Sequence, residues 1–228
     1  MKTLWLARLS RPDLLKPLSD LTRRVTCWTR ADDKRLYRLM NYLKATPNLT
    51  LVNRIGDKAE DLKLNLYTDA DHASEAEHAQ STSGCLLTLE GPNSWYPLTW
   101  LSKKQSATAR STTEAEMISL CTGIFGDALL IQEFAEQIFE KEVQLQCHQD
   151  NSAVIQIVEA GYSPKLRHVS KTHRINLSSL YEVFEDPSVR LTYISTDKQC
   201  ADIFTKALAP CKFPHALDLL QMKDTAKA

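Results

Sequence analysis

Four acidic residues lie at junctions between the strands and helices that the sequence of this 228-residue chain predicts. They are Asp69, Glu114, Asp150 and Asp202, and each stands where a predicted strand ends or a predicted helix begins. In a sheet flanked by helices, ligand sites gather at strand ends next to helix starts. The pattern therefore predicts an α/β domain in which the four carboxylates converge on one site.

Two of these acids end alternating segments. Residues 62–69 place leucines on one face of a predicted strand and end at Asp69, and residues 143–150 alternate in the same way up to Asp150. A helix that Gly161 stops follows Asp150. Taken alone, Asp69 could be a solvated residue closing a strand, and Asp150 could be a plain helix N-cap.

Glu114 opens a long predicted helix and fits a capping box with Ser111. At about 100° per residue, the apolar residues of this helix fill one arc, with Glu114 near its centre and Glu116 on the opposite, solvent side. An acid in a buried stripe is costly unless it has a partner, which favours a functional role for Glu114. The apolar residues are Met117, Ile118, Leu120, Cys121, Ile124 and Phe125.

Asp202 lies in a short predicted helix that follows a strand at 189–195. By itself an acid in the first turn merely suits the helix dipole. An all-carboxylate set, however, suits a hard octahedral cation, and the sequence offers no cysteine or histidine cluster for zinc. The four acids together therefore predict a two-metal phosphodiesterase centre that uses Mg²⁺, with Mn²⁺ as a substitute.

From its first residues to about Met222, the chain resembles the end of a copia-type retrotransposon polyprotein. Upstream segments, such as residues 37–47, resemble the last helices of a reverse transcriptase, and the rest resembles a ribonuclease H domain. The ribonuclease H motifs are Leu66–Asp71, Gln80–Gly84, Trp100–Gln105, Ser111–Glu116, Gln149–Asn151 and Ala201–Lys206.

This resemblance implies an RNase H-like mixed sheet flanked by helices. It also implies endonucleolytic hydrolysis of the RNA strand of an RNA/DNA hybrid, with the four acids as catalytic residues and metal ligands. Discrimination of RNA from DNA would use 2′-hydroxyl contacts, and basic side chains would hold phosphates. The expected substrate-binding residues are Asn151, Gln105, Asp71, Lys103 and Lys104.

The resemblance further divides the chain into three parts. Residues 1–60 are expected to be a helical remnant of the reverse transcriptase thumb or connection, residues 61–208 the RNase H-like domain, and residues 209–228 a C-terminal helix and tail. Pro47 and Gly56 mark the first boundary. The polymerase domain that would deliver the hybrid is an expected partner outside this chain, in the cytoplasm or in virus-like particles.

The sequence also departs from the family pattern. His72 and Met117 stand where the family commonly has an aromatic residue. Relatives often carry a histidine just before the fourth acid that is thought to help product leave, but residues 196–199 contain none. His168 and His173 are candidates to replace it, although a lone histidine on a helix is more often a surface or core residue. Slow turnover is expected from the lack of a histidine just before the fourth acid.

Composition sets further bounds. With 28 basic and 28 acidic residues the net charge is zero, so composition gives no support for strong nonspecific binding to nucleic acid. The six cysteines show no paired spacing, which favours reduced intracellular thiols. No apolar run approaches the ~18 to 20 residues of a membrane span, so no membrane partner is expected.

Two alternative functions remain open at this stage. The first is a catalytically decayed RNase H-like module that binds nucleic acid or protein, although the intact acids argue against complete decay. The second is a DNA-strand-transferring nuclease of the same superfamily. Those enzymes generally end their acidic set with glutamate, whereas here the glutamate comes second, so this alternative fits less well.

Overall fold

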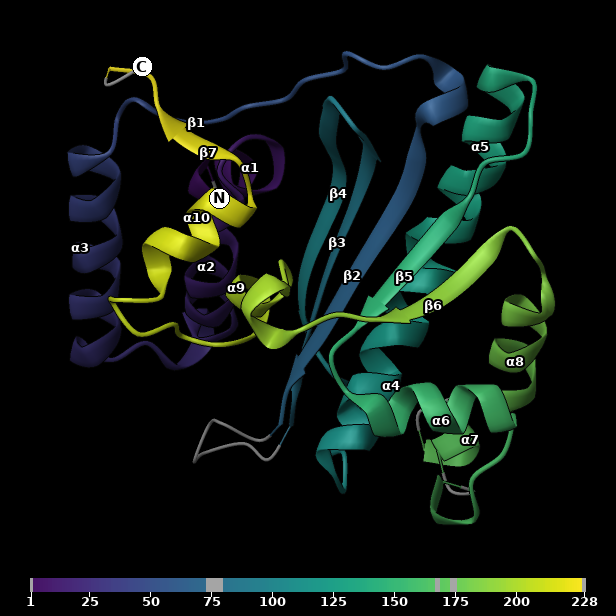
Figure 1. The fold of residues 1–228 in the computed structure, drawn as a ribbon. Helices are drawn as coiled ribbons and strands as arrows, with labels where there is room; N and C mark the ends of the chain where they lie inside the picture. The colour runs from purple at the N-terminus through teal and green to yellow at the C-terminus, as the bar shows by residue number, and fades with distance from the viewer. Residues whose placement is uncertain (1, 73–79, 167–168, 173–175, 227–228) are drawn as a thin grey trace.

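A five-stranded mixed sheet forms the centre of the molecule (Figure 1). The computed structural model describes residues 2–72, 80–166, 169–172 and 176–226. The strand order is β4-β3-β2-β5-β6, with β2, β3 and β4 antiparallel and β5 and β6 parallel to β2. The strands are β2 Lys63–Asp71, β3 Thr82–Gly91, β4 Ser94–Lys104, β5 Leu145–Gln149 and β6 Val189–Tyr193. The expected mixed sheet flanked by helices is confirmed.

The central strand β2 is covered on both faces. Leu64 and Leu66 belong to a core that packs under the long helical segment after β4. Tyr67 points to the other face and joins a second core built with the N-terminal and C-terminal helices. Because both faces are buried, almost every residue of β2 is buried, including the polar residues at its carboxyl end.

The helices between β4 and β6 cover the first face. A π-helical turn, Ile124–Ala128, joins the first two of them into one continuous helix. Gly161 ends the next helix in the left-handed conformation (φ 64°), as the sequence predicted. These helices are α4 Thr112–Gly123, α5 Leu129–Phe139, α6 Ser152–Ala160, α7 Val169–Thr172 and α8 Leu177–Glu185.

The N-terminal and C-terminal segments pack on the opposite face (Figure 1). The Trp100 indole on β4 donates to the main-chain oxygen of Ala7 at 2.8 Å, which ties the first helix to the sheet. A short antiparallel pair, β1 Leu49–Leu51 with β7 Met222–Asp224, joins the segment before β2 to the C-terminal segment. The helices here are α1 Lys2–Leu9, α2 Leu15–Arg23, α3 Arg30–Ala45, α9 Asp202–Thr205 and α10 Phe213–Leu219.

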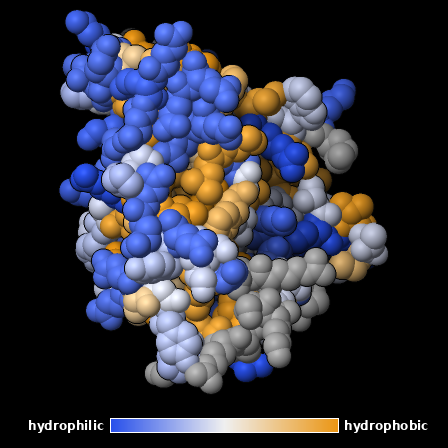
Figure 2. Space-filling view, turned by 90° about the vertical axis from the view of Figure 1, so that its right-hand side faces the viewer, coloured by the Kyte–Doolittle hydropathy of each residue, from blue (hydrophilic) through white to orange (hydrophobic). Residues whose placement is uncertain are grey.

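The continuous helix Thr112–Phe139 is long and apolar enough to cross a membrane, contrary to the expectation from the sequence. Half of its most apolar window is buried inside the molecule. α4 packs against β2 and β3, and core helices of globular domains meet the same criterion. Figure 2 shows the face on the right of Figure 1, where apolar residues gather at the centre between hydrophilic regions.

Candidate metal centre

β2 holds Asp69 at the point where the sheet meets α4. Asp69 is buried, with 2% of its surface exposed, and pairs across the sheet with Gly84 of β3. The Ser119 hydroxyl on α4 lies 2.7 Å from the main-chain oxygen of Asp69 and 3.2 Å from that of Gly84. This serine therefore joins α4 to both strands and fixes the backbone that carries the Asp69 side chain.

Gly84 lets α9 approach the sheet beside Asp69. A Cβ atom at Gly84 would lie 2.5 Å from the Thr205 methyl carbon and 3.0 Å from the main-chain oxygen of Ala201. The contact brings the Thr205 hydroxyl against Asp69, to which it donates a hydrogen bond. The absence of a side chain at Gly84 therefore positions Asp202, the first residue of α9, next to the site.

Three carboxylates meet at this junction. Oxygen atoms of Asp69, Glu116 and Asp150 all lie within 4.8 Å of one another. Asp69 comes from β2, Glu116 from α4, and Asp150 directly follows β5. The Thr196 hydroxyl donates to Asp150 Oδ2 at 2.9 Å, which helps to orient that carboxylate. Asn151, rather than Asp150, caps α6, because its side chain accepts from the Ala153 N–H.

The expected burial of Glu114 is confirmed, but the expected orientation of Glu116 is wrong. Glu116 does not face solvent: it is 4% exposed and it is the glutamate in the carboxylate group. Glu114 is also buried, but its Oε2 accepts from the Arg110 N–H at 3.0 Å and its own N–H donates to the Ser111 hydroxyl at 3.1 Å. The Ser111–Glu114 contact is one half of the capping box that the sequence offered as the alternative role, and the Glu114 carboxylate binds the main chain one residue before the cap.

Helical periodicity did not predict which glutamate joins the carboxylate group, because α4 is buried on all sides. Every residue from Glu114 to Cys121 is buried, so the apolar arc does not distinguish one face from another. A different signal was present in the small residues that share a face with Glu116. These are Ser119 and Gly123, and a Cβ atom at Gly123 would lie 3.1 Å from side-chain atoms of Leu66 and Thr68. Small residues at helical spacing mark the side of α4 that approaches β2.

Asp202 lies beside the three carboxylates and forms an ion pair with Lys206. Lys206 Nζ is 2.8 Å from Asp202 Oδ1 and 3.7 Å from Asp69 Oδ2. Neither Lys206 nor Thr205 was assigned a role from the sequence, although the spacing of Asp202 and Lys206 allows an ion pair within a helix. Burial, followed by the negative charge of Asp69, raises the pKa of Asp202 despite this pair.

The electrostatics of the group favour a bound cation. Burial, followed by the charges of Asp69 and Asp150, raises the pKa of Glu116, and burial also raises the pKa of Asp150. Glu116 Oε2 is buried without a hydrogen-bond partner among the described residues. An orphaned carboxylate oxygen aimed into an all-oxygen cluster fits a hard divalent ion. The residues present therefore fit the divalent ion that the sequence resemblance implies.

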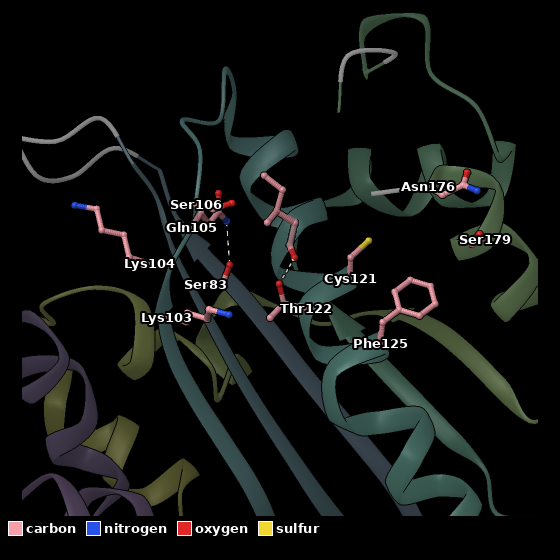
Figure 3. A pocket seen from close by; sticks show the side chains of 11 residues that line it. Ser83, Lys103, Lys104, Gln105, Ser106, Cys121, Thr122, Phe125, Asn176 and Ser179 are labelled. Atoms are coloured by element: carbon pink, nitrogen blue, oxygen red, sulfur yellow. Dashed lines mark hydrogen bonds between the residues drawn. The ribbon is translucent and has the colours of Figure 1, made fainter. Parts of the chain in front are cut away.

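A groove of about 470 Å³ lies between the end of β4 and helices α4 and α8, and its lining does not include the three carboxylates (Figure 3). Lys103, Lys104 and Gln105, expected to bind substrate, line one wall. The Gln105 amide nitrogen donates to the Ser83 hydroxyl at 3.0 Å and to the main-chain oxygen of Ala115 at 2.9 Å. Gln105 thus joins the end of β4 to β3 and α4, and Lys103 and Lys104 add positive charge to the same wall.

The other residues singled out in the sequence fall at several places. Asp71, the last residue of β2, and Asn151 are both half-buried. His72 Nε2 lies 3.2 Å from the main-chain oxygen of Ala109. Met117 is fully buried in the core. His168 and His173, the candidates for product release, lie outside the described residues.

No family model matches the chain. The retrovirus-related Pol polyprotein from transposon RE1 of Arabidopsis thaliana is 27% identical over 208 residues, which are 90% of this chain and 13% of that protein. The corresponding polyprotein from transposon TNT 1-94 of Nicotiana tabacum is 29% identical over 161 residues, or 70% of the chain and 11% of that protein. The chain is therefore similar to retrovirus-related Pol polyproteins of transposons. It spans only a small part of their length.

One relative is named as a secreted effector and not as a Pol polyprotein. Secreted RxLR effector protein 161 of Plasmopara viticola is 33% identical over 117 residues, covering 51% of this chain and 78% of that protein. Among solved structures, LC11-RNase H1 matches at a TM-score of 0.44 and 14% identity, over 63% of this chain and 92% of that one. The same enzyme in complex with an RNA/DNA hybrid matches at 0.43 and 15%, over 63% and 94%.

The strand order of the sheet defines the fold. The strands β4, β3 and β2 are antiparallel, β5 and β6 run parallel to β2, and the helices α4 and α5 connect β4 to β5. This arrangement is RNase H-like.

Proposed function

We propose that the chain is a ribonuclease H that hydrolyses the RNA strand of RNA/DNA hybrids in a metal-dependent reaction. The observation that carries the proposal is the convergence of Asp69, Glu116 and Asp150 within 4.8 Å at the sheet–helix junction. Similarity to the Pol polyproteins supports it, since reverse transcription produces hybrids of this kind. Relative to the sequence-based expectation, Glu116 replaces Glu114 as the second acid.

The side chains around the group have separate roles in this proposal. Asp69, Glu116 and Asp150 would hold the ions, and Asp202 would complete the set. Two divalent ions, Mg²⁺ by the preference of carboxylate oxygens and Mn²⁺ as a substitute, would supply an activated water and stabilise the leaving oxygen. Ser119 fixes the backbone at Asp69 and Thr196 orients Asp150, so both carboxylates are held in place before substrate arrives.

The substrate would lie across the carboxylates and extend into the groove. Lys103 and Lys104, which line the groove, would contact phosphates and so position the duplex without reading its sequence. Asn151, which follows Asp150, and Asp71, which ends β2, would contact a 2′-hydroxyl, the group that distinguishes RNA from DNA. Gln105 would act indirectly, through its bonds to Ser83 and Ala115, by holding the groove wall in place.

The chain organisation follows from the same proposal. Residues 61–208 would form the RNase H-like domain, residues 1–60 the end of the reverse transcriptase, and residues 209–228 a C-terminal extension. The polymerase domain of the polyprotein would deliver the hybrid, in the cytoplasm or inside virus-like particles. The β1–β7 pair joins the first and last of these parts.

A cleavage assay tests the proposed function. A hybrid with labelled RNA is incubated with the full chain and Mg²⁺, with duplex DNA, duplex RNA and chelator as controls. We expect cleavage of the RNA strand of the hybrid alone, and several orders of magnitude less in Asp69→Asn, which keeps the size of the side chain. Hybrid binding without cleavage by the wild-type protein would contradict the proposal and favour the decayed binding module.

A further inference from the structure

Lys206 places an ammonium group directly against the candidate metal ligands. Its Nζ lies 2.8 Å from Asp202 Oδ1 and 3.7 Å from Asp69 Oδ2. The first contact is an ordinary i,i+4 pair at the end of α9. The second is not local, because Asp69 lies on β2. Lys206 therefore bridges two carboxylates that come together only in the folded chain.

The two carboxylates that Lys206 contacts differ in their surroundings. The Asp69 side chain is 3% exposed, whereas those of Lys206 and Asp202 are 37% and 17% exposed. Asp69 Oδ2 is also the atom that accepts from the Thr205 hydroxyl. A half-exposed lysine has a path to solvent, so its ammonium can leave a carboxylate that cannot itself move far. Asp69 is thus the fixed partner and Lys206 the movable one.

We propose that Lys206 is an internal counter-ion that competes with the divalent ion for Asp69 and Asp202. The inference rests on the proposed function, since it assumes that a divalent ion binds this group. A carboxylate oxygen that accepts from an ammonium has less of its charge available to a metal ion, and a metal ion beside it repels the ammonium. Metal entry and the Lys206 bridge therefore exclude one another.

The contacts of Lys206 with Asp69 and Asp202 also stabilise the group of carboxylates when no metal ion is bound. Four acids near one another repel when no cation is bound, and orphaned Glu116 Oε2 shows that the protein does not satisfy them all. Lys206 offsets part of this repulsion at the Asp69 and Asp202 side. Among the described residues, no lysine or arginine forms an ion pair with Glu116. The ammonium thus lowers metal affinity while it stabilises the metal-free fold.

Metal titration of the metal-free full chain tests the competition. We measure Mg²⁺ and Ca²⁺ binding by calorimetry for the wild type, Lys206→Met and Lys198→Met. Lys198 is an exposed lysine before α9 and controls for loss of one positive charge. Lys206→Met should bind both ions about tenfold more tightly and melt at a lower temperature in chelator. Lys198→Met should stay within about twofold of the wild type.

A second measurement uses the wild-type chain alone, so it does not depend on whether a variant folds. Acetic anhydride labelling followed by mass spectrometry reports how accessible each lysine amine is. Lys206 should react slowly in chelator and severalfold faster with saturating Ca²⁺, whereas Lys198 should react at the same rate in both. A lysine that served only to pair with Asp202 within α9 would show no such dependence on the ion.

The outcomes separate this inference from the proposed function. If the wild type binds the ions but Lys206→Met binds them equally or more weakly, the competition is refuted while the metal site stands. Equal labelling of Lys206 with and without Ca²⁺ refutes it in the same way. If neither the wild type nor Lys206→Met binds a divalent ion, the metal site and the competition are both refuted.

Discussion

Asp69 and Glu116 face one another across the contact between β2 and α4, and small residues make this approach close enough for their carboxylates to meet. Ser119 bonds the backbone of Asp69 and Gly123 lies against Leu66 and Thr68. The approach of the Asp69 and Glu116 carboxylates therefore depends on uncharged residues that set the packing between β2 and α4. Disturbing the packing should disturb the site even where every acid is kept.

Gly84→Ala tests this dependence on the α9 side. The added Cβ would lie 2.5 Å from the Thr205 methyl and 3.0 Å from main-chain Ala201 O, so α9 must shift. We expect a loss of about 1–3 kcal/mol in stability and a marked loss of cleavage. The matched control is Gly126→Ala, where a Cβ meets nothing within 4 Å. Thermal melts and hybrid cleavage rates check both variants, and equal behaviour of the two would contradict this packing.

Asp150→Asn should separate repulsion from metal binding. The change removes one of the mutually repelling charges but leaves an oxygen that can accept from Thr196. In chelator the variant should melt at or above the wild-type temperature, and it should gain less from millimolar Mg²⁺. Asp197→Asn, an exposed aspartate nearby, is the control. Strong destabilisation without metal together with an undiminished Mg²⁺ shift would mean that Asp150 is structural.

The metal-free protein should lose stability as the pH rises. Burial, followed by neighbouring negative charge, raises the pKa of Glu116 and of Asp202 above the ordinary carboxyl range. The folded chain then holds these protons more tightly than the unfolded chain. Their stabilising effect is fully present below about pH 4 and disappears as the pH passes through the raised values.

Melting temperatures in chelator, measured across this pH range, check the prediction. Glu116→Gln cannot ionise at that position, so its stability should fall less steeply with pH than that of the wild type. Saturating Mg²⁺ should also flatten the wild-type curve, because a bound cation favours the ionised carboxylates. Parallel curves for the wild type and Glu116→Gln in chelator would show that Glu116 does not carry the raised pKa.

Local patterns predicted much of the sheet. The alternating segment ending at Asp69 lies in β2, and the alternating segment ending at Asp150 contains β5. Gly161 ends α6 in the left-handed conformation that glycine favours. These features depend on residues adjacent in the sequence, which is why the sequence alone was sufficient.

Features set by packing between distant segments were not predicted. Glu116 could not be chosen over Glu114 from periodicity because α4 is buried on all sides. The β1–β7 pair joins the segment before β2 to the C-terminal segment, and Lys206 reaches Asp69 only through the contact of α9 with Gly84. Each of these depends on how elements pack together, and hydrophobic periodicity carries no such information.

The most direct test compares Glu116→Gln with Glu114→Gln in the Mg²⁺-dependent cleavage of a labelled RNA/DNA hybrid. Glu116→Gln should lose several orders of magnitude in rate, because it removes a candidate metal ligand while keeping the size of the side chain. Glu114→Gln should keep most of its activity and lose about 1 kcal/mol of stability as the helix cap weakens. Near-normal cleavage by Glu116→Gln together with loss of cleavage in Glu114→Gln would contradict the account.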